Sequence, residues 1–153
     1  MKWFALLLAA SLIPAGASGA GLGDVKTVYL LPMSGSLDQY LAIRLTTGSI
    51  LQVVTDPQKA DAIFTDRIGS GLEETLADLY NDKPKDQGKD EFGAGKPNSP
   101  PITRGRGAIF LVDRKTRDVL WAASERPKNS SPEEVERAAD RIAGKLARSL
   151  EGK

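Results

Sequence analysis

GAIFLVDRKTRDVLWAASERPKNSSPEEVERAADRIAGKLARSL, residues 107–150, contains the patterns that indicate the architecture of the chain most directly. Two apolar runs, 107–113 and 118–124, lie on either side of the polar turn 114–117. Such runs around a short polar turn predict a β-hairpin. In 131–150 the apolar residues recur at intervals of three and one, which is typical of a helix with one apolar face. A helix of this kind after a hairpin is expected to cover a sheet.

The start of this last helix has a distinct signature. Ser131 is a favoured N-cap residue, Pro132 suits the first helical position, and Glu134 stands where a capping box needs an acidic side chain. We therefore expect the helix to begin at the Ser131–Pro132 step. Nearer the amino terminus, Ser36 and Gln39 have the same spacing and predict a capping box for an earlier helix.

The preceding part of the chain alternates between strand and helix patterns. Three short runs rich in β-branched and aromatic residues, 25–33, 50–55 and 60–65, predict strands. Helical spacing of apolar residues predicts helices over 36–47 and from residue 70 onward. The resulting order, β-α-β-β-α-β-β-α, predicts an α/β (α+β) fold with a mixed sheet of about five strands and helices mainly on one face.

The sequence predicts a single domain with one atypical segment. Residues 24–151 are expected to form this α/β domain, since their number suits a single hydrophobic core. Residues 81–106 are rich in proline, glycine and charged side chains and contain almost nothing apolar. This composition predicts a flexible polar insertion.

Residues 1–20 have the pattern of a secretory signal peptide. Lys2 precedes the apolar run 3–13, and small residues then follow. The run is shorter than the roughly 20 residues of a membrane-spanning helix, so we expect cleavage, after either Ala17 or Ala20. No transmembrane span and no lipid anchor are expected in the mature chain, since no cysteine follows the run. The predicted location is the bacterial periplasm or the exterior of the cell.

Composition excludes several classes of function. The chain has no histidine and no cysteine, which removes Ser-His and Cys-His nucleophile systems, zinc fingers and iron–sulfur ligation. Its 21 Lys+Arg and 20 Asp+Glu residues nearly balance, which is unlike a nucleic-acid-binding surface. We therefore expect a protein that is not an enzyme, that needs no cofactor or metal, and that binds no nucleic acid.

Few side chains stand out as candidates for a functional site. Arg104 and Arg106 are a pair of guanidinium groups that could hold a carboxylate or phosphate, and they are the tentative ligand-binding residues. Asp113 and Asp118 bracket the hairpin turn and are expected to be ordinary exposed carboxylates, so paired acid–base catalysis is disfavoured. Trp121 is expected to anchor the hairpin in the core, against the last helix.

Several short segments carry a resemblance to a known group of proteins. They are LP at 31–32, QVVTD at 52–56, ADAI at 60–63, FLVD at 110–113 and VLW at 119–121. With the element order, they resemble the small periplasmic α/β domains of the TolB amino-terminal and curli-secretion (CsgG-like) group and related envelope proteins. The resemblance implies envelope assembly or scaffolding through protein contacts, without a catalytic site. The chain departs from many members in lacking a lipid-anchoring cysteine.

Together these observations predict an exported, non-catalytic accessory protein of the cell envelope that binds or helps to assemble protein partners. An exposed sheet edge and residues 81–106 are the expected contact surfaces. The alternative is a small-molecule or anion-binding module that uses Arg104 and Arg106. A hydrolase that relies on Asp113 and Asp118 is the third possibility.

Overall fold

The computed structural model describes residues 21–80 and 107–152. Its helices and strands follow the order expected from the sequence, and the α/β fold class is confirmed. The elements are β1 (Thr27–Leu30), α1 (Leu37–Thr47), β2 (Gln52–Val53), β3 (Ala62–Thr65), α2 (Ser70–Tyr80), β4 (Ala108–Asp113), β5 (Val119–Ser124) and α3 (Pro132–Glu151). Short 3-10 helices occupy Leu22–Asp24, Ser34–Ser36 and Pro57–Lys59.

The strands form one mixed sheet of five strands in the order β2-β1-β3-β4-β5. β1 pairs in parallel with both β2 and β3, whereas β3 with β4 and β4 with β5 pair antiparallel. The chain therefore places β2 and β3 on opposite sides of β1, and only then builds the hairpin of β4 and β5. The two edges of the sheet are β2, with two residues, and β5, with six.

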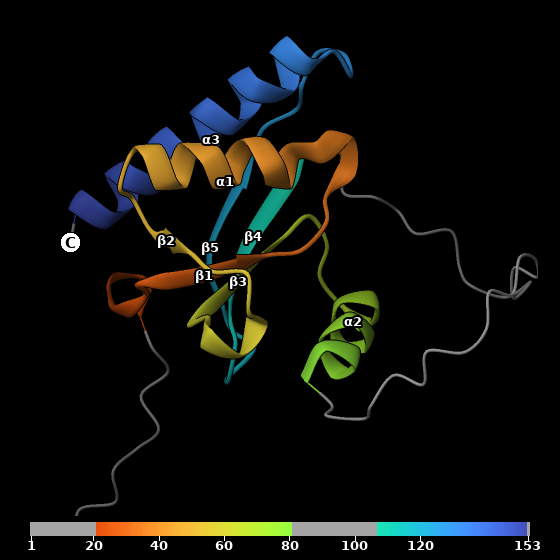
Figure 1. Ribbon diagram of the computed structural model, residues 1–153, viewed down its shortest axis with the longest axis vertical. Helices are drawn as coiled ribbons and strands as arrows, with labels where there is room; N and C mark the ends of the chain where they lie inside the picture. Colours follow the sequence, from red (N-terminus) through yellow and green to blue (C-terminus); the bar gives the residue numbers. More distant parts are fainter. Residues whose placement is uncertain (1–20, 81–106, 153) are drawn as a thin grey trace, which may run out of the picture.

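The helices cover the two faces of the sheet unequally. α1 and α3 lie side by side over one face, and α2 lies on the other (Figure 1). Six residues of α3 are buried in the larger core: Val135, Ala138, Ala139, Ile142, Ala143 and Leu146. The periodicity of three and one assigns these six residues to the apolar face together with Ala147 and Leu150, which are partly buried. The smaller core joins Leu72 and Leu76 of α2 to Ile63 and Val112 of the sheet.

Two helix starts differ from expectation in their hydrogen bonds. Ser36 has a φ of 60° and caps nothing with its side chain, because capping requires an extended backbone. The capping box predicted there is wrong. At α3 the Ser131 hydroxyl accepts from the Glu134 amide at 3.4 Å, as predicted. The amide of Ser131, however, donates to the side-chain oxygen of Asn129 at 2.9 Å, so the reciprocal half of that box is not formed by Glu134.

The signal peptide expected at 1–20 and the insertion expected at 81–106 lie outside the described residues. Within the described parts of the chain, none of the helices has the length and apolar character that a membrane crossing requires.

Candidate functional site

The sheet has a crevice where the carboxyl ends of β1 and β3 lie side by side. After β1 the chain continues to α1 on one face, and after β3 it continues to α2 on the other. Neighbouring parallel strands whose connections leave toward opposite faces form a topological switch point, where open α/β sheets bind ligands. We define the crevice by Ser34 and Gly35 after β1 and by Asp66 after β3.

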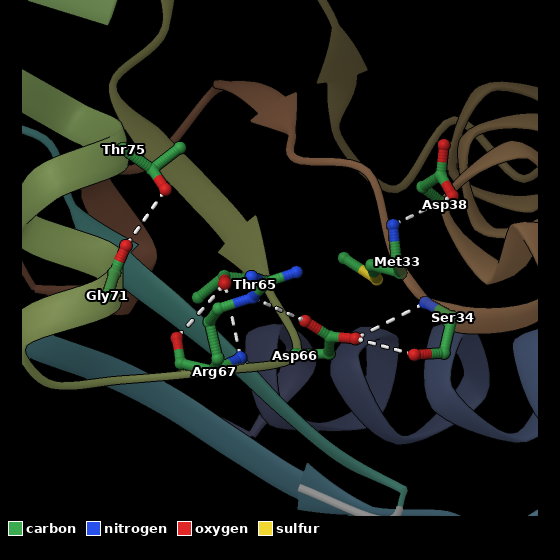
Figure 2. Close-up of polar contacts among 8 residues, drawn as sticks. All are labelled: Met33, Ser34, Asp38, Thr65, Asp66, Arg67, Gly71 and Thr75. Atoms are coloured by element: carbon green, nitrogen blue, oxygen red, sulfur yellow. Dashed lines mark hydrogen bonds and ion pairs between the residues drawn. The ribbon is translucent and has the colours of Figure 1, made fainter. Parts of the chain in front are cut away.

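A carboxylate joins the two loops of the crevice. Asp66 is only 7% exposed, and its Oδ2 accepts from the backbone N–H of Ser34 at 3.2 Å and from the Ser34 hydroxyl at 3.4 Å. Its other oxygen, Oδ1, accepts from Nε of Arg67 at 3.3 Å. Figure 2 shows this carboxylate between Ser34 and Arg67. The Asp66 contacts thus fix the loop after β1 to the end of β3.

Local hydrogen bonds shape the segment that carries Asp66. The buried Thr65 hydroxyl donates to the carbonyl of Arg67 at 3.0 Å and accepts from the Arg67 amide at 3.2 Å. On the other loop, the amide of Met33 donates to Oδ1 of Asp38 at 3.1 Å (Figure 2). These hydrogen bonds therefore restrict the backbone conformation of the first residues after β1 and after β3.

The crevice opens into a cavity of about 330 Å³. Its floor is apolar and includes the buried side chains of Leu37, Ile109 and Val135. Ser34 and Asp66 also line the cavity, together with residues of the segment that follows β5: Glu125, Arg126, Pro127, Asn129 and Ser130. A cavity of this size lies at the lower end of the range, about 300–1,000 Å³, that small-molecule sites occupy.

The polar side chains of the crevice are those of Ser34 and Asp66. The Ser34 hydroxyl faces a carboxylate, and the chain contains no histidine that would activate it as a nucleophile. Asp66 is an acceptor already occupied by Ser34 and Arg67. In the described residues no group of three or more acidic side chains is arranged to hold a metal ion.

The second candidate pair, Asp113 and Asp118, is placed differently from expectation. Asp113 is only 5% exposed, so the prediction of an exposed carboxylate is wrong for it. Its Oδ1 accepts from the amides of Lys115 and Thr116 at 2.7 and 2.8 Å, which draws the side chain into the turn. Asp118 is exposed, and its backbone carbonyl accepts a hydrogen bond from the Asp113 amide at 2.8 Å. Asp113 thus organises the hairpin turn.

The hairpin turn is also tied to the end of α2. The guanidinium carbons of Arg114 and Arg117 each lie 5.7 Å from the centre of the Tyr80 ring. The Tyr80 hydroxyl donates to the Pro57 carbonyl at 2.9 Å. Burial raises the pKa of Tyr80, against the opposing effect of the two arginines, so the phenol stays neutral and keeps its proton for this bond.

β5 exposes part of its backbone at the edge of the sheet. The Glu125 amide donates to the Gly107 carbonyl at 2.7 Å, so these residues form a hydrogen-bonded pair. Such pairs alternate along an antiparallel ladder. The backbone groups of Ser124 and Ala122, opposite Ala108 and Phe110, therefore point away from β4. The side chain of Lys145 reaches one of them, the Ser124 carbonyl, at 3.5 Å.

Trp121 joins β5 to the larger core. Its side chain is half-buried, and its ring meets that of Phe64 edge-on, with 6.4 Å between centroids. Its indole N–H donates to the hydroxyl of Ser149 on α3 at 3.0 Å. Partial burial against another aromatic ring and a satisfied N–H are the usual features of a tryptophan with a structural role.

Arg104 and Arg106, the tentative ligand-binding residues, lie outside the described part of the chain. Sequence reasoning did not single out Ser34 or Asp66, which form the crevice. One signal was present, because Asp66 directly follows the predicted strand 60–65 and Ser34 directly follows 25–33. Polar residues at the carboxyl ends of two strands meet only if those strands are parallel neighbours, and this depends on the strand order.

Comparison of the chain with models of protein families, with curated proteins and with solved structures finds no match.

Proposed function

We propose that this protein is an exported, non-catalytic accessory protein of the bacterial cell envelope that binds a protein partner at β5, an edge strand that pairs on one side only within residues 21–80 and 107–152. The observation that carries the proposal is the edge itself. β5 has six residues, VLWAAS, with no proline and no charged side chain among them. Natural proteins commonly protect an edge strand with such residues or by making it very short, as at the two-residue β2.

The backbone geometry supports binding by strand addition. The N–H and C=O of Ala122 and the N–H of Ser124 point away from β4 and can pair with an extended segment of another chain. Val119, on the same strand, has 48% of its surface exposed. An added strand would shield this apolar side chain, which gives the association a hydrophobic contribution.

The other parts of the proposal rest on sequence. The pattern of residues 1–20 favours export, and the resemblance to the TolB amino-terminal and curli-secretion (CsgG-like) group favours a role in envelope assembly. The absence of histidine and cysteine favours a function without catalysis.

The experiment compares two substitutions at one position in living source cells. Ala122→Pro removes an outward N–H without removing a bond to β4, whereas the matched control Ala122→Thr keeps that N–H and suits a strand. The tagged full chain is cross-linked in cells and purified, after circular dichroism has established that each variant is folded. We expect a stoichiometric envelope protein with wild type and with Ala122→Thr, and its loss with Ala122→Pro. A partner retained by Ala122→Pro, or no stoichiometric partner at all, would contradict the proposal.

A second candidate function, small-molecule or anion binding, is favoured by the cavity of about 330 Å³ at the crevice. The tentative residues Arg104 and Arg106 belong to this alternative. A thermal-shift screen of metabolites tests it, since a ligand at 100 times its dissociation constant stabilises by about 2.7 kcal/mol. Loss of a shift in Asp66→Asn would assign the ligand to the crevice, and loss in the double variant Arg104→Ala, Arg106→Ala would assign it to the arginine pair.

A further inference from the structure

Beside the β5 edge, α3 carries a row of cations. Arg141, Lys145 and Arg148 follow one another at intervals of four and three residues, so they lie along one side of the helix. We call these three residues the basic stripe. Arg141 and Lys145 both form ion pairs with Glu125, directly after β5, and the Arg141 pair measures 2.7 Å. Lys145 also reaches the Ser124 carbonyl. The basic stripe therefore runs along the end of the free edge.

The charges of the basic stripe are only partly balanced. Its Arg141 and Lys145 share the single carboxylate of Glu125. Hydrogen bonds from Lys145 and Arg141, which outweigh burial, hold the pKa of Glu125 below its ordinary value, so this group is fully ionised at neutral pH. Arg148 is exposed, and within 21–80 and 107–152 no carboxylate lies within ion-pair distance of it. An excess of positive charge thus remains beside the edge.

A hollow of about 420 Å³ lies between the edge strand and the basic stripe. Trp121, Ala122 and Ala123 of β5 line one side of it, and Lys145, Arg148 and Ser149 of α3 line the other. The two cationic side chains therefore face the space that the side chains of an added strand would enter.

The side chains on the two faces of β5 have different surroundings, and this difference predicts which kinds of residue should alternate along an added strand. Trp121 pairs with Leu111 and lies on the face covered by α3. Ala122 pairs with Phe110 and lies on the face covered by α2. Val119 pairs with Val112 and lies on the same face, because the register between β4 and β5 shifts between Leu111 and Val112. Successive side chains of a strand alternate between faces. Those on the α3 side would meet the basic stripe, and those on the other side would meet small and apolar groups.

We propose that the β5 edge and the basic stripe together bind an extended acidic segment of a partner protein, in which carboxylates alternate with apolar residues. The carboxylates face Lys145 and Arg148, and the apolar residues lie beside Ala122, on the face covered by α2. This inference rests on the proposed function, because it names the chemistry of the partner's segment. A second copy of the chain is a poorer occupant, since it would bring its own basic stripe and an edge strand without carboxylates.

The test uses three synthetic octapeptides that alternate valine with glutamate, glutamine or lysine. Their binding to the full chain is measured by fluorescence anisotropy of a labelled peptide at low and at high salt. We expect the glutamate peptide to bind about tenfold more tightly than the glutamine peptide at low salt, and the difference to shrink as salt screens the charges. Equal binding of the two peptides, or no binding of the glutamate peptide, would overturn the inference.

Charge-reversal variants locate the site. Arg148→Glu should weaken binding of the glutamate peptide by about fivefold, since exposed ion pairs contribute up to about a factor of five. The matched control is Arg137→Glu, the same change on the same helix three turns away, and it should leave the affinity unchanged. An equal effect of both variants would mean general attraction to a basic protein and would overturn the inference.

The edge variant separates this inference from the proposed function. If Ala122→Pro abolishes binding of the glutamate and the glutamine peptides alike, and the two bind equally to wild type, the acidic pattern is wrong and strand addition stands. If the glutamate peptide binds Ala122→Pro as well as wild type, strand addition itself fails, and the inference fails with it. Sedimentation of the full chain as a dimer that Ala122→Pro dissociates would assign the edge to a second copy and would also overturn the inference.

Discussion

Replacement of Gly107 by alanine should destabilise the protein more than any other glycine-to-alanine change in residues 21–80 and 107–152. Gly107 precedes β4 and has a φ of 84°, a conformation that costs a residue with a Cβ about 1–2 kcal/mol. A Cβ added there would lie 2.5 Å from the carbonyl oxygen of Glu125, where no real Cβ can stand. Relief of that contact must displace the backbone bond from Glu125 to Gly107, which contributes about 1 kcal/mol more. We expect a total loss of about 3 kcal/mol.

Substitutions at two other glycines separate the backbone strain from the contact with Glu125. Gly69 has a φ of 92° but nothing within 4 Å of an added Cβ, so Gly69→Ala should cost only the strain of about 1–2 kcal/mol. Gly144 lies inside α3 with free space around it and no positive φ, so Gly144→Ala should stabilise the helix by about 0.5–1 kcal/mol.

The assay is urea unfolding of the three variants and wild type, followed by circular dichroism. The order of stability should be Gly144→Ala, wild type, Gly69→Ala and Gly107→Ala. The same order should appear in the melting temperatures, at roughly 4 °C per kcal/mol for a domain of this size. If Gly107→Ala costs no more than Gly69→Ala, the contact with Glu125 does not constrain the hairpin, and the reasoning is refuted.

Three further substitutions test the hairpin and its contacts. Asp113→Ala leaves two turn amides without their acceptor and should cost about 1–2 kcal/mol in urea unfolding, whereas an unchanged midpoint would mean that water replaces the carboxylate. Trp121→Phe keeps the aromatic packing but loses the bond to Ser149, so a loss of about 1 kcal/mol is expected, and Ser149→Ala should lose a similar amount. The pKa of Glu125 is lowered in the folded protein, so its ion pairs stabilise the fold fully above about pH 4.3, the ordinary glutamate value. This contribution to the free energy of unfolding is lost as the pH falls through the lowered pKa of the folded state. Stability measured from pH 6 to pH 3 should therefore fall more steeply for wild type than for Glu125→Gln, and parallel curves would contradict this.

Local patterns were sufficient to predict every α-helix and strand of the described chain, but not the three short 3-10 helices. The apolar period of three and one over 131–150 and the two runs around 114–117 determine α3 and the hairpin, because neighbouring residues alone produce these signals. The boundaries were less well predicted. The strand expected at 50–55 is only Gln52–Val53, because the Ile50 amide still donates to the Leu45 carbonyl of α1 and a 3-10 helix begins at Pro57.

The side-chain hydrogen bonds that cap the helices could not be predicted from residue spacing alone. Ser36 and Ser131 both occur three residues before Gln or Glu, yet only Ser131 caps its helix with the side chain. The difference lies in the backbone: Ser131 is extended, with a ψ of 147°, whereas Ser36 follows Gly35 into the left-handed region.

By itself the sequence determined the type and order of the elements, and with them the fold class. Tertiary structure alone decided which of these elements became neighbours. Ser34 and Asp66 meet across 32 residues only because β3 pairs in parallel with β1, and Lys145 lies at Ser124 only because α3 packs against the edge hairpin. Strand order and helix placement depend on how distant apolar faces bury one another, and a local pattern contains no information about that choice. The crevice and the basic edge therefore exist only in the folded chain.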